Sequence, residues 1–178
     1  GDLQYFVTLG NFTDFYYNYQ LENREIIEQE LALSTTQINQ LFQQLNTSVY
    51  SNERFYTYKF IDRNCTTMVV DKINSTLGNE YIKSQTSNQS YREILYPYMS
   101  DFYMKLGIQL IFGAKVDQPA TRLFLPYEFK KSLSKTKISE KSIEKSNKTV
   151  FEARKTNVPF NWLNSIYSLI GVLLILVF

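Results

Sequence analysis

The stretch Tyr58-Lys-Phe-Ile-Asp-Arg-Asn-Cys-Thr-Thr67 marks a point where a strand gives way to a helix. Aromatic residues at positions 56, 58 and 60 alternate with polar ones, which is the period of a half-buried strand. Apolar residues then recur at helical spacing over 66–73, and Gly78 supplies a typical helix end. The sequence therefore predicts that its only cysteine, Cys65, lies at a strand-to-helix corner.

A cysteine at such a corner favours nucleophilic chemistry. The N-terminus of a helix presents unpaired amides and the positive end of the helix dipole, which stabilise a thiolate and can donate to an oxyanion. Arg63 adds a positive charge two residues before Cys65. The alternative interpretation is structural, because a lone cysteine is often a small buried apolar residue. Spacing alone leaves both interpretations open.

The composition limits what the chain can do by itself. A length of 178 residues suits one domain with a real core. Residues 1–127 contain ten Lys and Arg against 13 Asp and Glu, whereas 128–155 contain nine against four, so the basic excess is local and does not predict a nucleic-acid surface. The chain has no histidine, which excludes a complete Cys-His, Ser-His or zinc-His site built from these residues alone. We predict no cofactor and no metal.

Local signals predict an α+β domain with helices packed on a small antiparallel sheet. The clearest is Ser34-Thr-Thr-Gln37, a reciprocal capping box that opens an amphipathic helix ending near Asn46. Pro126 at the first turn opens a second short helix. The other predictions are strands at 3–9, 25–33 and 149–153, a helix at 11–19, a helical region at 91–112 interrupted by Pro97 and Gly107, and loops at 79–90 and 113–122.

The core Asp62-Arg63-Asn64-Cys65-Thr66-Thr67, which follows an aromatic strand and opens a helix, resembles the signature of the bacterial family titled Lnb N-terminal periplasmic domain. The chain departs from that pattern where Arg63 stands in place of an aspartate and Met68 in place of a basic residue. Weaker similarities follow in order over residues 1–133, among them Asn23-Arg24, Tyr91-Arg92, Asp117-Gln118-Pro119-Ala120-Thr121 and Phe124-Leu125-Pro126.

That family resembles the permuted, NlpC-type branch of the papain-like superfamily, in which a histidine strand precedes the cysteine helix. The resemblance implies a partial papain-like domain with Cys65 as catalytic nucleophile and the histidine strand upstream of this chain. Asn64 and Thr66 are the candidate supporting or oxyanion residues. Asp62 and Asp117 are candidates to contact substrate or to orient the histidine, although a loop aspartate such as Asp117 more often caps a turn.

The chain changes character twice after residue 133. Residues 134–159 are rich in Ser, Lys and Glu, and we predict a basic polar linker or exposed excursion. Residues 160–178 carry no charge, and we predict the start of a transmembrane helix, because a full span needs about 20 apolar residues. The predicted domains are therefore 1–133, 134–159 and 160–178.

Two signals disagree about topology. The basic run before the apolar segment places the domain in the cytoplasm by the positive-inside rule, whereas the resemblance places it in the periplasm. Long folded domains cross membranes largely regardless of charge, so we follow the resemblance. The sequence predicts a membrane-anchored envelope protein facing the periplasm, a cysteine-dependent hydrolase or acyltransferase acting on an amide or ester. Its predicted partners are the lipid bilayer and an unidentified peptide, lipid or glycan conjugate. The alternative is a non-catalytic envelope module that keeps the fold for binding or assembly.

Overall fold

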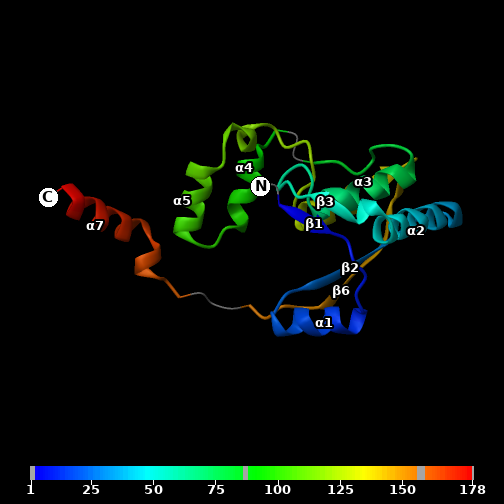
Figure 1. Cartoon of the computed structure of the whole chain (residues 1–178), viewed down its shortest axis with the longest axis horizontal. Coiled ribbons are helices and arrows are strands. Elements are labelled where there is room, and N and C mark those ends of the chain that lie inside the picture. Colours follow the sequence, from blue (N-terminus) through cyan, green and yellow to red (C-terminus); the bar gives the residue numbers. More distant parts are fainter. Residues whose placement is uncertain (1–2, 86–87, 156–158, 178) are drawn as a thin grey trace. The chain divides into compact units, whose positions relative to one another are not determined.

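The computed structural model describes residues 3–85, 88–155 and 159–177, and the chain forms two compact units (Figure 1). Unit 1 comprises Gly1–Gln85 with Thr121–Arg154, and unit 2 comprises Thr86–Ala120 with Lys155–Phe178. Helices and short antiparallel sheets both occur, which confirms the α+β prediction.

Unit 1 contains three antiparallel strand pairs among the described residues, in place of the one small sheet predicted. These are β1 (Gln4–Phe6) with β3 (Phe55–Thr57), β2 (Ile26–Leu31) with β6 (Glu144–Phe151), and β4 (Lys137–Ile138) with β5 (Lys141–Ser142). Its helices are α1 (Phe12–Leu21), α2 (Thr35–Tyr50), α3 (Cys65–Leu77) and α6 (Pro126–Lys135), with the 3-10 turn η1 (Asn52–Arg54) before β3.

Three of the predicted helix ends are confirmed, and one is wrong. Ser34 and Gln37 form the reciprocal capping box of α2, and Pro126 is the first residue of α6. Gly78 ends α3 with a φ of 75°, a left-handed conformation that disfavours any residue with a Cβ. The helix α2 runs to Tyr50, one turn beyond the predicted end at Asn46.

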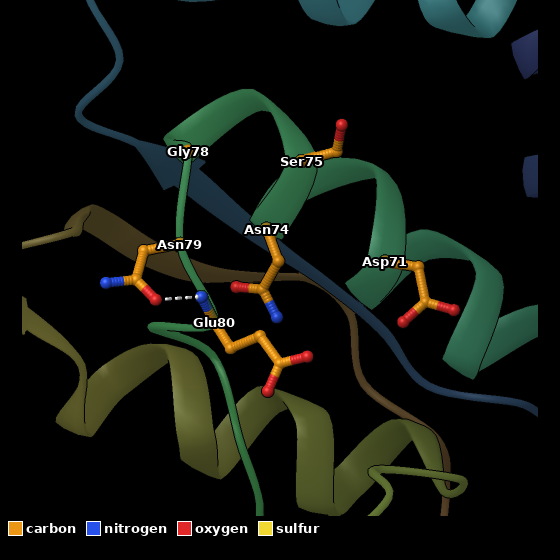
Figure 2. Close-up of a pocket in the computed structure, with 6 residues that line it drawn as sticks. All are labelled: Asp71, Asn74, Ser75, Gly78, Asn79 and Glu80. Atoms are coloured by element: carbon orange, nitrogen blue, oxygen red, sulfur yellow. Dashed lines mark hydrogen bonds between the residues drawn. The ribbon is translucent and has the colours of Figure 1, made fainter.

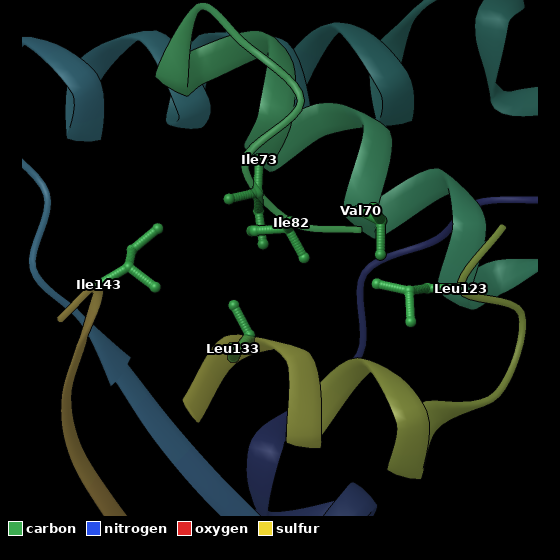
Figure 3. Close-up of a cluster of buried hydrophobic side chains, with 6 residues drawn as sticks. All are labelled: Val70, Ile73, Ile82, Leu123, Leu133 and Ile143. Carbon is green, nitrogen blue, oxygen red and sulfur yellow. The ribbon is translucent and has the colours of Figure 1, made fainter. Parts of the chain in front are cut away.

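The hydrophobic core of unit 1 packs α3 against α6 (Figure 3). Ile73 points from α3 toward Leu133 of α6, Val70 points toward Leu123, and Ile82 from the segment after α3 lies beside Ile73. Leu123 and Ile143 complete the cluster. Because α3 begins at Cys65, this core fixes the orientation of the helix that carries the cysteine.

The region 134–159, predicted to be a basic polar linker or exposed excursion, contains strands in its described part. The strand β6 pairs with β2 along its length, and most of its side chains are exposed. Two cross-strand ion pairs join them, from Lys148 to Glu28 at 2.9 Å and from Lys145 to Glu30 at 2.5 Å. Two of the lysines that suggested a solvated linker, Lys145 and Lys148, therefore pair with acidic residues of β2.

Unit 2 is helical in its described part. It contains α4 (Tyr91–Leu95), α5 (Phe102–Ile111) and α7 (Ile166–Val177), with the 3-10 turns η2 (Tyr96–Tyr98), η3 (Ala114–Asp117) and η4 (Trp162–Asn164). Pro97 interrupts the region as predicted, but Gly107 lies inside α5, because one glycine costs a helix only about 1 kcal/mol. The hydroxyl of Tyr103 lies 2.7 Å from that of Ser168 and links α5 to α7.

The apolar residues of the C-terminal region form a short helix. The helix α7 has 12 residues, and nearly all its large apolar side chains are exposed. Among the residues that the structure describes, no helix is both long and apolar enough to cross a membrane.

Candidate functional site

A closed turn connects β3 to the helix that carries Cys65. The amide of Lys59 donates to the carbonyl of Arg63 at 3.0 Å, and the amide of Arg63 donates back at 2.9 Å. Asn64 then takes an extended conformation and caps α3. Cys65 is therefore the first residue of the helix, which is the corner that the sequence predicts.

The side chain of Asn64 holds this corner together. Its Oδ1 accepts a hydrogen bond from the amide of Thr67 at 2.9 Å, while the Thr67 hydroxyl accepts one from the amide of Asn64 at 2.9 Å. Its Nδ2 donates to the carbonyls of Phe60 at 2.8 Å and Phe124 at 2.7 Å. Both Nδ2 hydrogens are thus engaged with backbone, so the Asn64 side chain braces the corner.

Cys65 itself faces solvent. Its thiol is exposed, whereas the next residue, Thr66, is buried. The cap satisfies the amide of Thr67, and an α-helix offers no internal acceptor to the amides of its first two residues, here Cys65 and Thr66. An accessible thiol thus lies beside two backbone donors and the positive end of α3.

Tyr56 and Tyr58 lie close enough to Cys65 to be affected by its charge. Tyr5 of β1 stacks on Tyr58 with ring centroids 4.6 Å apart, and Tyr56 lies on the same strand pair, with the Arg63 guanidinium 5.7 Å from its ring centroid. Burial raises the pKa of both Tyr56 and Tyr58, and negative charge on Cys65 raises both further. The sequence pattern placed Tyr56 and Tyr58 on a strand but did not indicate them as site residues, and Tyr5 gave no signal because it meets them through strand pairing.

Asp62 lies beside the corner. Its backbone carbonyl accepts a hydrogen bond from Arg122 at 3.2 Å, and Arg122 also pairs with Asp71 of α3 at 2.8 Å. Asp62 lines a cavity of about 380 Å³, whose other lining residues include both acidic and basic side chains. They are Ser48, Glu53, Phe55, Arg63, Met68, Asp71, Lys72 and Arg122. The structure therefore brings Asp62, Asn64, Cys65 and Thr66 together, as their spacing requires, and adds Arg122, for which the sequence offered no signal.

Asp117 belongs to unit 2 and has a structural partner there. Its carboxylate takes two hydrogen bonds from Arg92, at 2.6 and 3.2 Å, and these lower its pKa below the usual range. The same guanidinium donates to the carbonyls of Ile108 at 2.9 Å and Phe112 at 3.3 Å. Asp117 thus helps Arg92 join α4, α5 and η3.

A polar hollow of about 430 Å³ lies at the other end of α3 (Figure 2). Asn74 and Ser75 line it from the helix, and Asn79 and Glu80 line it from the following turn. Asn74 is nine residues from Cys65 along α3, about 14 Å, and Asp71 lines both this hollow and the cavity beside Asp62. Among the described residues, no group of three or more His, Cys, Asp or Glu side chains is placed to hold a metal ion.

Comparison with known families identifies the chain. Residues 1–97 match the family model described as Lnb N-terminal periplasmic domain. This range includes the whole Cys65 corner, whereas the weaker similarities over residues 98–133 lie outside it. No curated protein and no solved structure matches the chain. Since the match covers 97 of 178 residues, the protein belongs to the family of Lnb N-terminal periplasmic domains.

Proposed function

We propose that this protein is the cysteine-bearing part of an envelope enzyme, a thiol hydrolase or acyltransferase that acts on an amide or ester at the periplasmic side. The observation that carries the proposal is the exposed Cys65 at the first position of α3, held there by the buried Asn64 network. A buried cysteine, the structural alternative, does not fit an exposed thiol. Membership of a periplasmic domain family supports the location.

The proposed reaction begins with attack of the Cys65 thiolate on the carbonyl carbon of the substrate. The amides of Cys65 and Thr66 donate to the oxyanion that forms. Collapse of this intermediate breaks the bond to the amine or alcohol, which leaves with a proton from the general acid, and the acyl group stays on sulfur as a thioester. Water then releases an acid, or a second nucleophile takes the acyl group.

The proton carrier lies outside this sequence. The chain has no histidine, and we propose that a histidine strand upstream of it supplies the base, as in the permuted papain-like proteins that the Cys65 motif resembles. The tyrosines around the thiol and the cavity beside Asp62 offer contacts for substrate.

We further propose that the apolar segment 160–178 contributes to a membrane anchor, so that the lipid bilayer is a partner. It carries no charge, and its large apolar side chains are mostly exposed in the described part. The helix α7 covers only about 18 Å, so a span requires more residues than α7 contains. Flotation of the native protein with liposomes tests the anchor, and a protein that stays at the bottom of the gradient opposes it.

Activity-based labelling of the full-length protein tests the enzyme. A thiol-directed acylating probe should label the wild type once per chain at Cys65, and Cys65→Ser should remove the label. Substitution of an upstream histidine by alanine should slow the labelling without unfolding the protein. Equal labelling of the histidine variant and the wild type favours the non-catalytic envelope module, which needs an accessible cysteine but no base.

A further inference from the structure

A second cavity in unit 1 has a volume of about 690 Å³. It shares no lining residue with the Cys65 corner, and its size falls in the usual range for small-molecule sites. Its lining comes from the end of α1, from β2 and from the first turns of α6, as well as one residue after β6. The lining residues are Tyr19, Asn23, Arg24, Glu25, Ile27, Gln29, Pro126, Tyr127, Phe129, Lys130 and Ala153.

The walls of this cavity are fixed by hydrogen bonds. Gln29 of β2 donates to the backbone carbonyl of Lys130 in α6 at 3.2 Å and to Glu144 of β6 at 2.9 Å. The Tyr127 hydroxyl also donates to Glu25 at 3.3 Å. Hydrogen bonds therefore tie α6 to β2 and to the residue before it.

The rim is also held in place. Asn23 has a φ of 53°, which is unusual for a residue with a side chain. Its side chain accepts from the amide of Arg154 at 2.7 Å and donates to the carbonyl of Arg154 at 2.9 Å. The next residue, Arg24, lies 4.3 Å above the ring of Tyr19 and pairs with Glu22. A rim fixed in this way spares a ligand the entropic cost of ordering it.

The lining chemistry selects among ligand classes. Five of the 11 lining residues are charged or carry an amide, so the cavity offers donors and acceptors that an acyl chain cannot use. The positive charges of the lining are offset by acidic neighbours. Arg24 pairs with Glu22. Side-chain hydrogen bonds lower the pKa of Glu144, and the nearby charge of Lys130 lowers it further. A strongly anionic ligand therefore has no excess of positive charge to meet.

What the cavity offers is an aromatic surface bordered by donors and acceptors. The ring of Tyr127 is 46% exposed and is oriented by its hydrogen bond to Glu25. A pyranose ring has the matching surface, because its C–H face is apolar and its edge carries hydroxyls. We propose that this cavity, named here the Tyr127 cavity, binds a short neutral oligosaccharide, with one sugar stacked on Tyr127 and its hydroxyls bonded by Arg24 and Lys130.

Calorimetric titration of the whole chain with the β1,4-linked trimer of N-acetylglucosamine, with cellotriose and with laurate tests the proposal. One of the two oligosaccharides should bind saturably and laurate should not. Tyr127→Ala should weaken binding about tenfold, as expected for a lost aromatic stacking partner, whereas Tyr127→Phe should bind nearly as the wild type does. Tyr17→Ala is the matched control, because Tyr17 is an exposed tyrosine of α1 that does not line the cavity.

Circular dichroism of each variant separates lost binding from lost structure, and Arg24→Gln tests the rim without altering α6. Cys65→Ser should bind as the wild type does, so this proposal and the proposed enzyme can fail separately. The proposal is overturned if the folded wild type binds neither oligosaccharide, if laurate alone binds, or if Tyr127→Ala binds as tightly as Tyr17→Ala.

Discussion

Replacing Asn64 by alanine should destabilise unit 1 far more than the loss of an ordinary polar side chain. Asn64 is 4% exposed and makes three side-chain hydrogen bonds to backbone, one to the amide of Thr67 and two to the carbonyls of Phe60 and Phe124. Loss of an N-cap costs about 1 kcal/mol. Loss of each buried hydrogen bond to a carbonyl costs about 1 kcal/mol as well, which gives about 3 kcal/mol in total.

Urea unfolding followed by circular dichroism measures this loss as a change in the free energy of unfolding. Asn147→Ala is the control, because Asn147 lies exposed on β6 with one side-chain bond to Glu144 at 2.7 Å, and its change should stay within about 0.5 kcal/mol. Asn64→Asp separates the cap on Thr67 from the two bonds to the carbonyls of Phe60 and Phe124. It keeps the capping oxygen but replaces the donor Nδ2 with an oxygen that faces both carbonyls. A loss below about 1 kcal/mol for Asn64→Ala would refute the reasoning.

Three further predictions concern other parts of the chain. Gly78→Ala should cost about 1 kcal/mol of unfolding free energy in the same urea assay, because the φ of 75° strains a Cβ although no atom lies within 4 Å of it. Lys148→Glu should weaken the pairing of β2 with β6, because it places two acids together. The double variant Lys148→Glu, Glu28→Lys restores an opposite pair, so its unfolding free energy should exceed the value expected from the sum of the two single changes by about 0.5 kcal/mol. Single changes that add fully would contradict the ion pair. Arg92 lowers the pKa of Asp117. The bond between Arg92 and the ionised carboxylate therefore stabilises the fold at neutral pH, and this stabilisation is lost as the pH falls through the lowered pKa. Asp117→Asn should remove that part of the acid dependence in thermal melts between pH 2 and 7, and an unchanged profile would contradict it.

Local signals predicted the Cys65 corner well. The capping box at Ser34, the proline that opens α6 and the glycine that ends α3 depend on residues close in the chain, so one stretch of sequence predicts them, whereas the cap that Asn64 forms on α3 was not predicted. The position of Cys65 at the start of α3 follows from the same local rules, whereas its exposure does not, since spacing left a buried cysteine open.

Long-range pairing was not predictable in the same way. The strand β6 has the composition of a solvated linker, and its backbone pairs with β2 more than 110 residues earlier in the chain, with Lys145 and Lys148 bonded to Glu30 and Glu28. Tyr5 and Arg122 reach the Cys65 corner by strand pairing and by a return of the chain, and Asp117 is explained by Arg92, 25 residues away. The pattern of residues within a short stretch of sequence cannot predict partners that lie this far apart in the chain.

The reactivity of Cys65 tests the central claim most directly. The alkylation rate of this thiol by iodoacetamide at pH 7 can be compared between the folded protein and the same protein in urea, where the helix is absent. The chain has one cysteine, so peptide mapping assigns the product without ambiguity. If α3 and its amides activate the thiol, the folded protein should react about tenfold faster than the unfolded one. Equal or slower alkylation of the folded protein, despite an exposed thiol, would contradict the assignment of Cys65 as a nucleophile.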